Sequence, residues 1–572
     1  MSSPFNRFYE AELSKLRSLS VEFSRENPSI APMLGSESTD PDVERLLEGV
    51  AFLNALTRQK LDDEFPEIAN ELAAILAPQM LRPLPAATII QFIPKISVNE
   101  AQIIPPGTEI ASIPVEGTTC RFRTTSAVVV DGVTISGAKT AKTLQGNTRL
   151  SIDIERPATG KSFDKLRLFL GDEVPVASTW MMAMAMHLKS VRLVNDRGEG
   201  VPLKPEVHFP GFDEPLFPYP NNAFPGFRLL QELLFFPQKF LFVEFQDLTP
   251  ASERVRGSKL QLQLEISKDA GLLPDLTDQS FMVGAAPAVN LFECDAEPVY
   301  VDHRVAEYTI HPEGRNAAFT QIFSVDSVES FSQGAQSATP YSPFNLLGSL
   351  GGHKKTYRLS RQRSIVDGVL ETLITLPYNP NEIPTPEVLS IRLTCCNWRV
   401  TEALRLGDIS RPTVSSPEMF QFKNIKPVTN GSDTLVGVHL LWGVIAHSAT
   451  NLLALESVEN LRALIAHYNA SHEFEHSTRF TNDRYIAGMT GLVMTQESRL
   501  LRGIVVQGQK VTLEVDQTHW ASRGLLYLWG SVLDRFLSGY SGINAYTRFE
   551  IHDPASGLEL RWPLRQGLKR LL

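Results

Sequence analysis

The chain has 572 residues, with 54 Lys and Arg against 64 Asp and Glu, and a net charge of -10. This acidic balance argues against a protein that binds nucleic acid by neutralising phosphates, and against docking on anionic lipid. Hydrophobic residues make up 43% of the chain and charged residues 21%. Both values are typical of globular proteins, and the length predicts about three or four domains.

The sequence shows no signal for secretion or for crossing a membrane. The longest uncharged apolar run, Val174 to Leu188, has 15 residues, whereas a spanning helix needs about 20. We predict a buried, Met-rich helix there. The four cysteines are too few and too scattered for a disulfide framework, and the adjacent Cys395 and Cys396 are predicted to be small buried residues of a strand. We therefore expect a cytoplasmic protein without direct membrane insertion.

The first 85 residues have helical spacing of apolar residues. Helices are predicted from Pro4 to Asn27, from Pro41 onward, and, as a separate shorter helix, over Pro66–Leu76. The second carries a 3–4 pattern that predicts one apolar face. Its members are Val43, Leu46, Leu47, Val50, Leu53 and Leu56. Such a face can pack in the chain's own core or dock on partner helices, and these six residues are the candidate partner interface.

After Leu84 the pattern changes to period-2 alternation, most clearly at Leu150–Ile154 and Leu260–Ile266, which predicts half-buried strands. Other expected elements are helices at about 175–187, 227–236, 461–468 and 525–537, a loop at 330–355, a strand at 511–515 and a hairpin over 549–562. The expected fold class is α+β and multidomain. Its expected parts are a helical region 1–85, a β-rich domain with short helices 86–285, a second β-rich domain 286–430 and a mixed α+β domain 431–572.

One local motif suggests metal chemistry. His472 and His476 form an H-E-x-x-H sequence with Glu473 between them, and on a helix two such histidines share a Zn²⁺ with the glutamate as general base. Glu497 is the candidate third ligand. The surrounding residues are polar, which favours a surface loop or short helix instead. A zinc metallopeptidase with His472, His476 and Glu497 is the alternative function.

Two further motifs are incomplete. Gly160–Ser162 resembles the end of a phosphate-binding loop, but Glu155 stands where the motif needs glycine. Gly539–Ile543 misses the last position of a hydrolase nucleophile elbow, and a helix C-terminal turn is expected there. We expect no catalytic residue and no cofactor.

Longer runs of residues, in the same order along the chain, match one known family. They are Phe8–Leu13, Ala31–Gly35, Ser38–Leu53, Lys60–Glu67, Leu81–Pro85, Pro114–Gly117, Cys120–Arg123, Gly226–Glu232, Phe236–Phe242, Val289–Phe292, Val301–Arg304 and Val532–Phe549. On these runs the chain resembles the type VI secretion baseplate subunit TssF, the VasA/ImpG family. The stretch Leu441–Leu455, after a short Lys426-Pro427 approach, departs from the family pattern.

The resemblance implies a structural protein with no catalytic residue. In that family two TssF copies join one TssG in a wedge, TssK attaches, and wedges surround the VgrG spike, with TssE as a further candidate partner. The baseplate starts tube and sheath polymerisation, changes conformation at contraction, and docks at an inner-membrane complex through other subunits. A third possibility, besides the metallopeptidase, is a β-rich binding module outside any machine.

The charge is distributed unevenly. Residues 1–85 hold 8 basic and 14 acidic side chains, whereas 561–572 hold four basic side chains and no acidic one. These opposed ends are either solvated surface or a device that steers docking.

Overall fold

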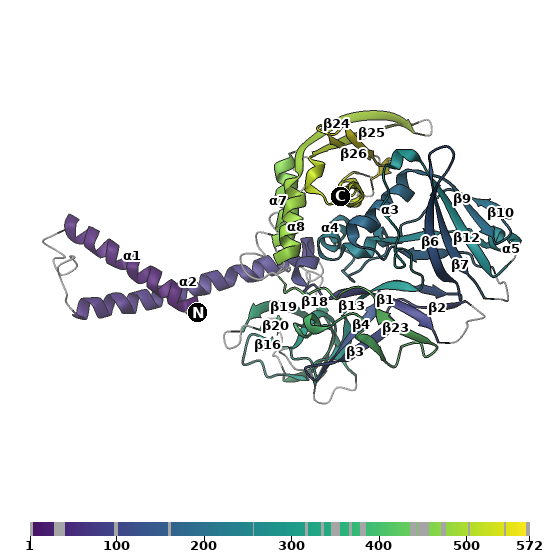
Figure 1. The fold of residues 1–572 in the computed structure, drawn as a ribbon. Helices are drawn as coiled ribbons and strands as arrows, with labels where there is room; N and C mark the ends of the chain where they lie inside the picture. Colours follow the sequence, from purple (N-terminus) through teal and green to yellow (C-terminus); the bar gives the residue numbers. More distant parts are fainter. Residues whose placement is uncertain are drawn as a thin grey trace. The chain divides into compact units, whose positions relative to one another are not determined.

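The computed structural model of the chain describes residues 4–27, 41–95, 101–157, 162–255, 257–314, 319–332, 337–344, 355–364, 369–377, 385–434, 443, 457–470, 476–501, 504–542 and 545–567. The chain divides into a helical unit, residues 1–75 with 436–445, and a β-rich unit, residues 76–435 with 446–572. A helical N-terminal region, followed by several β-sheets with helices between their strands, confirms the predicted multidomain α+β class (Figure 1).

The helical unit contains α1 (Pro4–Glu26) and α2 (Pro41–Leu76). Both begin at the predicted proline, which suits a first helical turn because its missing N–H would have no partner there. The predicted separate helix from Pro66 is wrong, because α2 is continuous over 36 residues. An interior proline removes one backbone hydrogen bond, but the flanking Leu, Ala and Glu residues favour helix strongly enough to keep it continuous.

The β-rich unit contains two large sheets with long-range pairing. The eight-stranded sheet has the order β14 (Phe292–Asp295), β21 (Glu387–Asn397), β17 (Thr320–Ser332), β18 (Thr339–Pro343), β19 (Thr356–Arg363), β20 (Leu370–Thr375) and β16 (Tyr308–Thr309), with β15 (Val299–Val301) also on β21. The six-stranded sheet has the order β22 (Ile409–Pro412), β3 (Glu109–Val115), β4 (Thr118–Thr124), β13 (Ala285–Val289), β1 (Ala87–Pro94) and β23 (Phe420–Asn424).

These sheets correct one expectation. The predicted loop at 330–355 is wrong over 330–332, which are the end of β17, and over 339–343, where β18 pairs with both β17 and β19. Serine and proline there suggested a loop, but β18 is largely exposed, and an exposed strand does not need apolar alternation. The six-stranded sheet also takes strands from both predicted middle domains, and its core contains Phe92 and Phe422 with ring centroids 5.8 Å apart.

A five-stranded sheet carries the two strands that were predicted from alternation. Its order is β10 (Gly200–Leu203), β9 (Leu188–Asn195), β12 (Lys259–Ile266), β7 (Thr148–Glu155) and β6 (Thr134–Lys142). β12 and β7 are direct antiparallel neighbours along their whole lengths, and their leucines and isoleucines are buried. Two short pairs accompany it, β8 (Leu166–Phe169) with β11 (Phe242–Phe245) and β2 (Gln102–Ile104) with β5 (Val128–Val130).

The C-terminal sheet has the order β24 (Met489–Leu501), β25 (Ile504–Val515), β26 (Ala545–Asp553) and β27 (Leu558–Arg561), with β28 (Arg565–Gln566) on β26. The predicted strand at 511–515 and the terminal hairpin are confirmed. The helices of the β-rich unit are α3 (Val174–Met186), α4 (Pro225–Phe235), α5 (Thr249–Arg254), α7 (Val458–Ala470), α8 (His476–Ala487) and α9 (Arg523–Ser538). No helix in the described ranges is long and apolar enough to cross a membrane.

Helix α9 is almost entirely buried in the β-rich unit. Ser522 caps this helix by accepting a hydrogen bond from the Leu525 amide, and its own hydroxyl donates to the Pro175 carbonyl at the start of α3. Gly524 lies against the α3 backbone with no room for a side chain. On another side of α9, the Trp562 indole donates to the Ser531 hydroxyl at 2.9 Å. The Met-rich α3 is buried, as predicted.

Candidate partner interface

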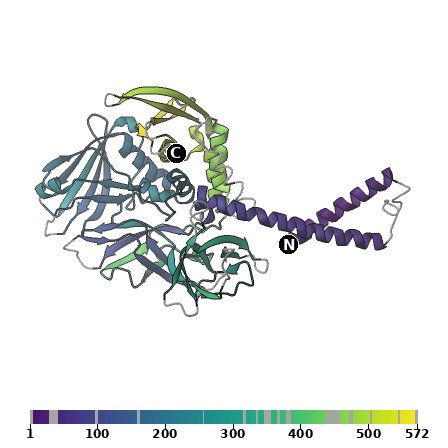
Figure 2. The same ribbon diagram turned by 180° about the vertical axis from the view of Figure 1, so that it is seen from behind.

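The helical unit is a hairpin in which α1 and α2 run in opposite directions (Figures 1 and 2). Arg17 of α1 donates from Nη2 to Glu44 Oε2 of α2 at 2.9 Å. Glu44, through its hydrogen bond and its charge, raises the pKa of Arg17. Both side chains are about half exposed, so solvent screens the pair. The Arg17–Glu44 pair therefore contributes little to the stability of the hairpin, but it marks the side of α2 that faces α1.

The side of α2 that faces α1 carries small residues. Ala51 and Ala55 are fully buried. They follow Glu44 by 7 and 11 residues, close to two and three helical turns, and so share its face. Alanine lets a neighbouring helix approach closely. The large apolar side chains of α2 are therefore left for the other side of the helix.

Four of the six predicted interface residues form an exposed stripe, here called the α2 stripe. It consists of Leu46, Val50, Leu53 and Leu56, which are 71%, 45%, 63% and 44% exposed. At 100° per residue these positions lie opposite Ala51 and Ala55. Leu47 is half buried, and the side chain of Val43 lies outside the described residues. A contiguous patch of large, exposed apolar side chains along one side of a helix is typical of an interaction surface.

Sequence reasoning missed other exposed apolar residues of α2. Phe52 lies beside the α2 stripe, and Leu72 and Ile75 are exposed near the end of the helix. Phe52 falls outside the 3–4 spacing, which explains its omission. The i, i+3 spacing of Leu72 and Ile75 is a usable signal, but the expected break at Pro66 separated them from the stripe.

The segment that follows α2 is fixed inside the β-rich unit. Ala77 to Met80 are buried, and the Met80 carbonyl accepts a hydrogen bond from Thr434 Oγ1 at 2.7 Å. Leu84 and Ser432 exchange two backbone hydrogen bonds of 2.8 and 2.9 Å. Gln79 donates to the Tyr468 hydroxyl on α7. Two regions distant in sequence, around Ser432 and at Tyr468, therefore hold this segment.

Arginines complete that attachment. The Arg82 guanidinium donates to the Pro218 carbonyl at 2.6 Å and lies 4.9 Å from the Phe323 ring centroid, and burial lowers its pKa. Arg361 of β19 donates to the Leu81 carbonyl and, at 2.9 Å, to the Ile322 carbonyl. Buried backbone carbonyls need such donors because water does not reach them.

Of the three predicted metal ligands, the structure describes the positions of His476 and Glu497. His472 lies outside the described residues, and His476 is the first residue of α8. Glu497 lies on β24, where its carboxylate pairs with Arg499 at 3.4 Å and with Arg548 at 3.6 Å. These two positive charges partly balance the carboxylate without a metal ion. Within the described ranges no three His, Cys, Asp or Glu side chains are grouped as a metal site.

A family model for the type VI secretion system protein TssF matches residues 1–569. The chain belongs to the TssF family. This TssF-family protein is similar to the type VI secretion system component TssF1 of Pseudomonas aeruginosa, with 26% identity over 617 aligned positions covering 98% of each chain.

Two solved structures are also similar to this TssF-family chain. The first is a cryo-electron microscopy structure of a TssK-TssF-TssG baseplate subcomplex, with a TM-score of 0.77, 26% identity, and 92% of this chain and 99% of that chain covered. The second is a type VI baseplate complex, with a TM-score of 0.62, 22% identity, and 99% and 100% covered; it supports the fold alone. The family match and the first structure make this chain a baseplate component of a type VI secretion system.

Proposed function

We propose that the chain is a structural wedge subunit without a catalytic role, and that its helical hairpin joins a bundle with TssG and a second copy of the chain. The observation that carries this proposal is the exposed α2 stripe. Its side chains are large and apolar, and they lie on the side of α2 opposite the alanines that face α1. Full burial of each side chain would lower the free energy by roughly 1 to 2 kcal/mol. A helix-in-groove or bundle contact is the way an amphipathic helix covers such a face.

The wider partner set follows from the relatives. A similar solved chain is part of a subcomplex with TssK and TssG, which supports TssG and TssK as partners here. The family resemblance adds TssE and the VgrG spike, and a cytoplasmic position in a baseplate docked at the inner-membrane complex. No observation favours the zinc metallopeptidase, since Glu497 is already paired with Arg499 and Arg548.

The α2 stripe is tested with the double variant Leu46→Asp, Leu53→Asp. Two carboxylates cannot be buried unpaired in a helix interface, so co-purification of TssG with the chain should be lost. Both residues are exposed, so circular dichroism and the melting temperature should stay as in the unchanged chain. The control is Leu144→Asp, Leu272→Asp, which makes the same change at two fully exposed leucines of the β-rich unit. Retained TssG in the α2 variant contradicts the proposal.

The second copy is tested by mass. Co-expression of the chain with TssG and TssK, followed by light scattering on the purified complex, should give a mass that contains two copies of the chain for each TssG. A complex with a single copy would contradict that part of the proposal while leaving the TssG contact intact.

A further inference from the structure

A cavity of about 800 Å³ opens in the β-rich unit between the edge of the six-stranded sheet and the ends of two strands of the eight-stranded sheet. Strands β3, β4 and β22 line one side, and β17 and β21 line the other. Glu109, Arg121 and Asn397 supply charged and amide groups to its wall, and Phe319 and Val414 supply apolar surface.

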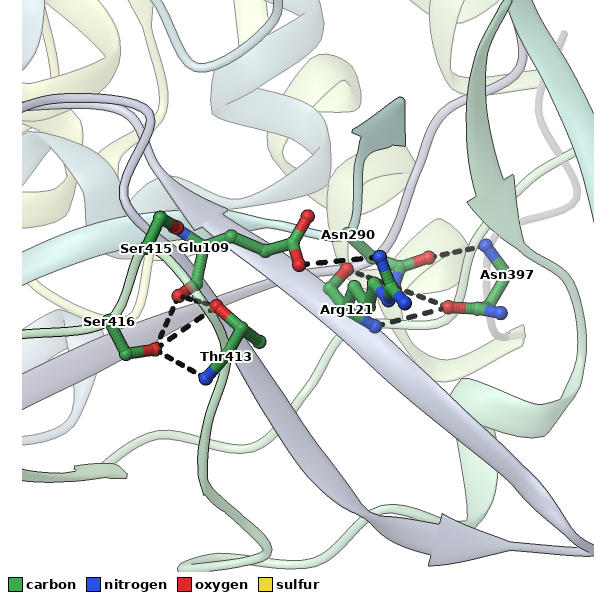
Figure 3. A network of polar contacts seen from close by, with 7 residues as sticks. All are labelled: Glu109, Arg121, Asn290, Asn397, Thr413, Ser415 and Ser416. Carbon is green, nitrogen blue, oxygen red and sulfur yellow. Dashed lines mark hydrogen bonds and ion pairs between the residues drawn. The ribbon is translucent and has the colours of Figure 1, made fainter. Parts of the chain in front are cut away.

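Asn397, at the end of β21, is a buried polar residue of this cavity, with only 4% of its surface exposed. Its Oδ1 accepts from the Arg121 backbone N–H at 3.4 Å and from Asn290 Nδ2 at 2.9 Å, and its backbone N–H donates to Asn290 Oδ1 at 2.6 Å (Figure 3). The Arg121 amide fixes Oδ1 as the acceptor. The Nδ2 donor therefore remains, with no hydrogen bond to any described residue.

The Arg121 guanidinium is also incompletely matched. Its one ion pair among the described residues joins Nη1 to Glu109 Oε1 at 3.5 Å, with the two side chains 39% and 26% exposed. A guanidinium offers five N–H donors in a fork that fits a carboxylate in a bidentate way. A single long contact leaves most of that fork available. Figure 3 shows Arg121 between Glu109 and Asn397.

The Glu109 backbone is held independently of its side chain. Its carbonyl accepts from Thr413 Oγ1 at 2.7 Å and from Ser416 Oγ at 2.6 Å, and its N–H donates to Ser415 Oγ at 3.0 Å. The Glu109 carboxylate can therefore be replaced by another carboxylate as the partner of Arg121, and strand β3 stays in place. An inorganic anion would fill a small part of a cavity of this size, which is in the range that encloses much larger ligands.

We propose that this cavity binds an acidic side chain of an extended segment of a partner protein. The partner's carboxylate accepts from the Arg121 guanidinium, Asn397 Nδ2 offers the segment a separate donor, and a neighbouring apolar residue packs on Phe319 and Val414. Charge-assisted hydrogen bonds of this kind are about twice as strong as neutral ones. The site lies in the β-rich unit and does not depend on the α2 stripe.

The test uses the isolated full chain and two fluorescent five-residue peptides, one with glutamate between two leucines and one with glutamine in its place. Fluorescence anisotropy should show the glutamate peptide binding about tenfold tighter, a difference of one charge-assisted contact. Arg121→Gln should remove that preference. Glu109→Gln should strengthen binding of the glutamate peptide several-fold because it frees the guanidinium, and this gain does not depend on how well the Arg121 variant folds.

Arg411→Gln is the matched control, because Arg411 is an exposed arginine of β22 that does not line the cavity. It should leave peptide binding unchanged. Three results would overturn the proposal. The two peptides could bind equally well, neither the unchanged chain nor Glu109→Gln could bind them, or the preference for glutamate could persist in Arg121→Gln. If sodium acetate displaced the labelled peptide as effectively as unlabelled glutamate peptide does, the cavity would be a site for small anions instead. None of these results depends on TssG co-purification.

Discussion

At the scale of single residues, Arg167 on β8 shows how the β-rich unit holds charge next to its core. Its guanidinium donates to both oxygens of Glu214, at 2.9 and 3.1 Å, and from Nε to Glu244 at 2.8 Å. Glu244 lies on β11 and is buried. Its burial opposes ionisation, but hydrogen bonds from Gln246 and Arg167 and the charge of Arg167 outweigh this, so the pKa of Glu244 is lowered. The pair links two adjacent strands.

The lowered pKa predicts a pH dependence of stability. A carboxylate with a depressed folded-state pKa adds stability above the ordinary glutamate value of about 4.3, and that stability is lost as pH falls through the folded-state pKa. Glu244→Gln should therefore lower the melting temperature by a few degrees near neutral pH. The gap between variant and unchanged chain should close as the pH is lowered below 4, as measured by scanning calorimetry over a pH series.

The control for this prediction is Glu253→Gln, at an exposed position of α5. It should leave the melting temperature unchanged at every pH. If the difference caused by Glu244→Gln is the same at neutral and acid pH, the ionised form of Glu244 does not contribute the stability described here.

At the scale of elements, glycine sets the distance between α9 and its neighbours. A Cβ on Gly524 would overlap the backbone of Ser178 and Thr179 in α3, and one on Gly530 would overlap the Trp562 ring. Both glycines cost helix propensity, so their presence in a buried helix is explained by the close approach they permit. The pattern of apolar residues predicts α9 but gives no sign of this proximity.

Gly524→Ala should be destabilising although alanine is the better helix former. The added methyl group forces α9 and α3 apart, which costs about 1 to 3 kcal/mol and should lower the melting temperature. Gly49→Ala in α2 is the matched control, because space around Gly49 is open and alanine should favour that helix by up to about 1 kcal/mol. An unchanged melting temperature for Gly524→Ala would contradict the packing described here.

The sequence predicts elements better than it predicts their neighbours. Apolar periodicity was sufficient for α1, α4, α7 and α9, a long uncharged apolar run for α3, and alternation for β7 and β12. Pairing such as β1 with β23, more than 300 residues apart, has no local signal, so the cavity at Arg121 and Asn397 could not be predicted. The β24–β25 hairpin was only partly predicted because much of β24 is exposed on both faces, which weakens alternation.

At the scale of the whole molecule, the basic C-terminal end is partly neutralised. Arg561 pairs with Glu559 at 2.6 Å, and Arg565 pairs with Asp534 of α9; Lys569 and Arg570 lie outside the described residues. In the acidic helical region, Arg17 of α1 pairs with Glu44 of α2. Steering by opposed ends, a prediction from the sequence, would therefore depend mainly on the acidic residues 1–85.

A structural role also predicts the metal content of the purified chain. Elemental analysis should find much less than one equivalent of zinc, and His472→Ala should not change that value, since Glu497 is held by two arginines rather than free for a metal. One equivalent of zinc in the unchanged chain, absent from His472→Ala, would instead support the metallopeptidase as the function.

The α2 stripe has a consequence for how such a chain must be produced. A monomer that displays Leu46, Val50, Leu53 and Leu56 to water can lower its free energy by covering them with any similar surface, including that of another copy. Self-association increases with the concentration of the chain itself, whereas binding to a partner increases with the concentration of that partner. The proposed bundle therefore predicts that the yield of usable subunit depends on the ratio in which the chain and its bundle partner are synthesised, and that an excess of the chain aggregates more readily.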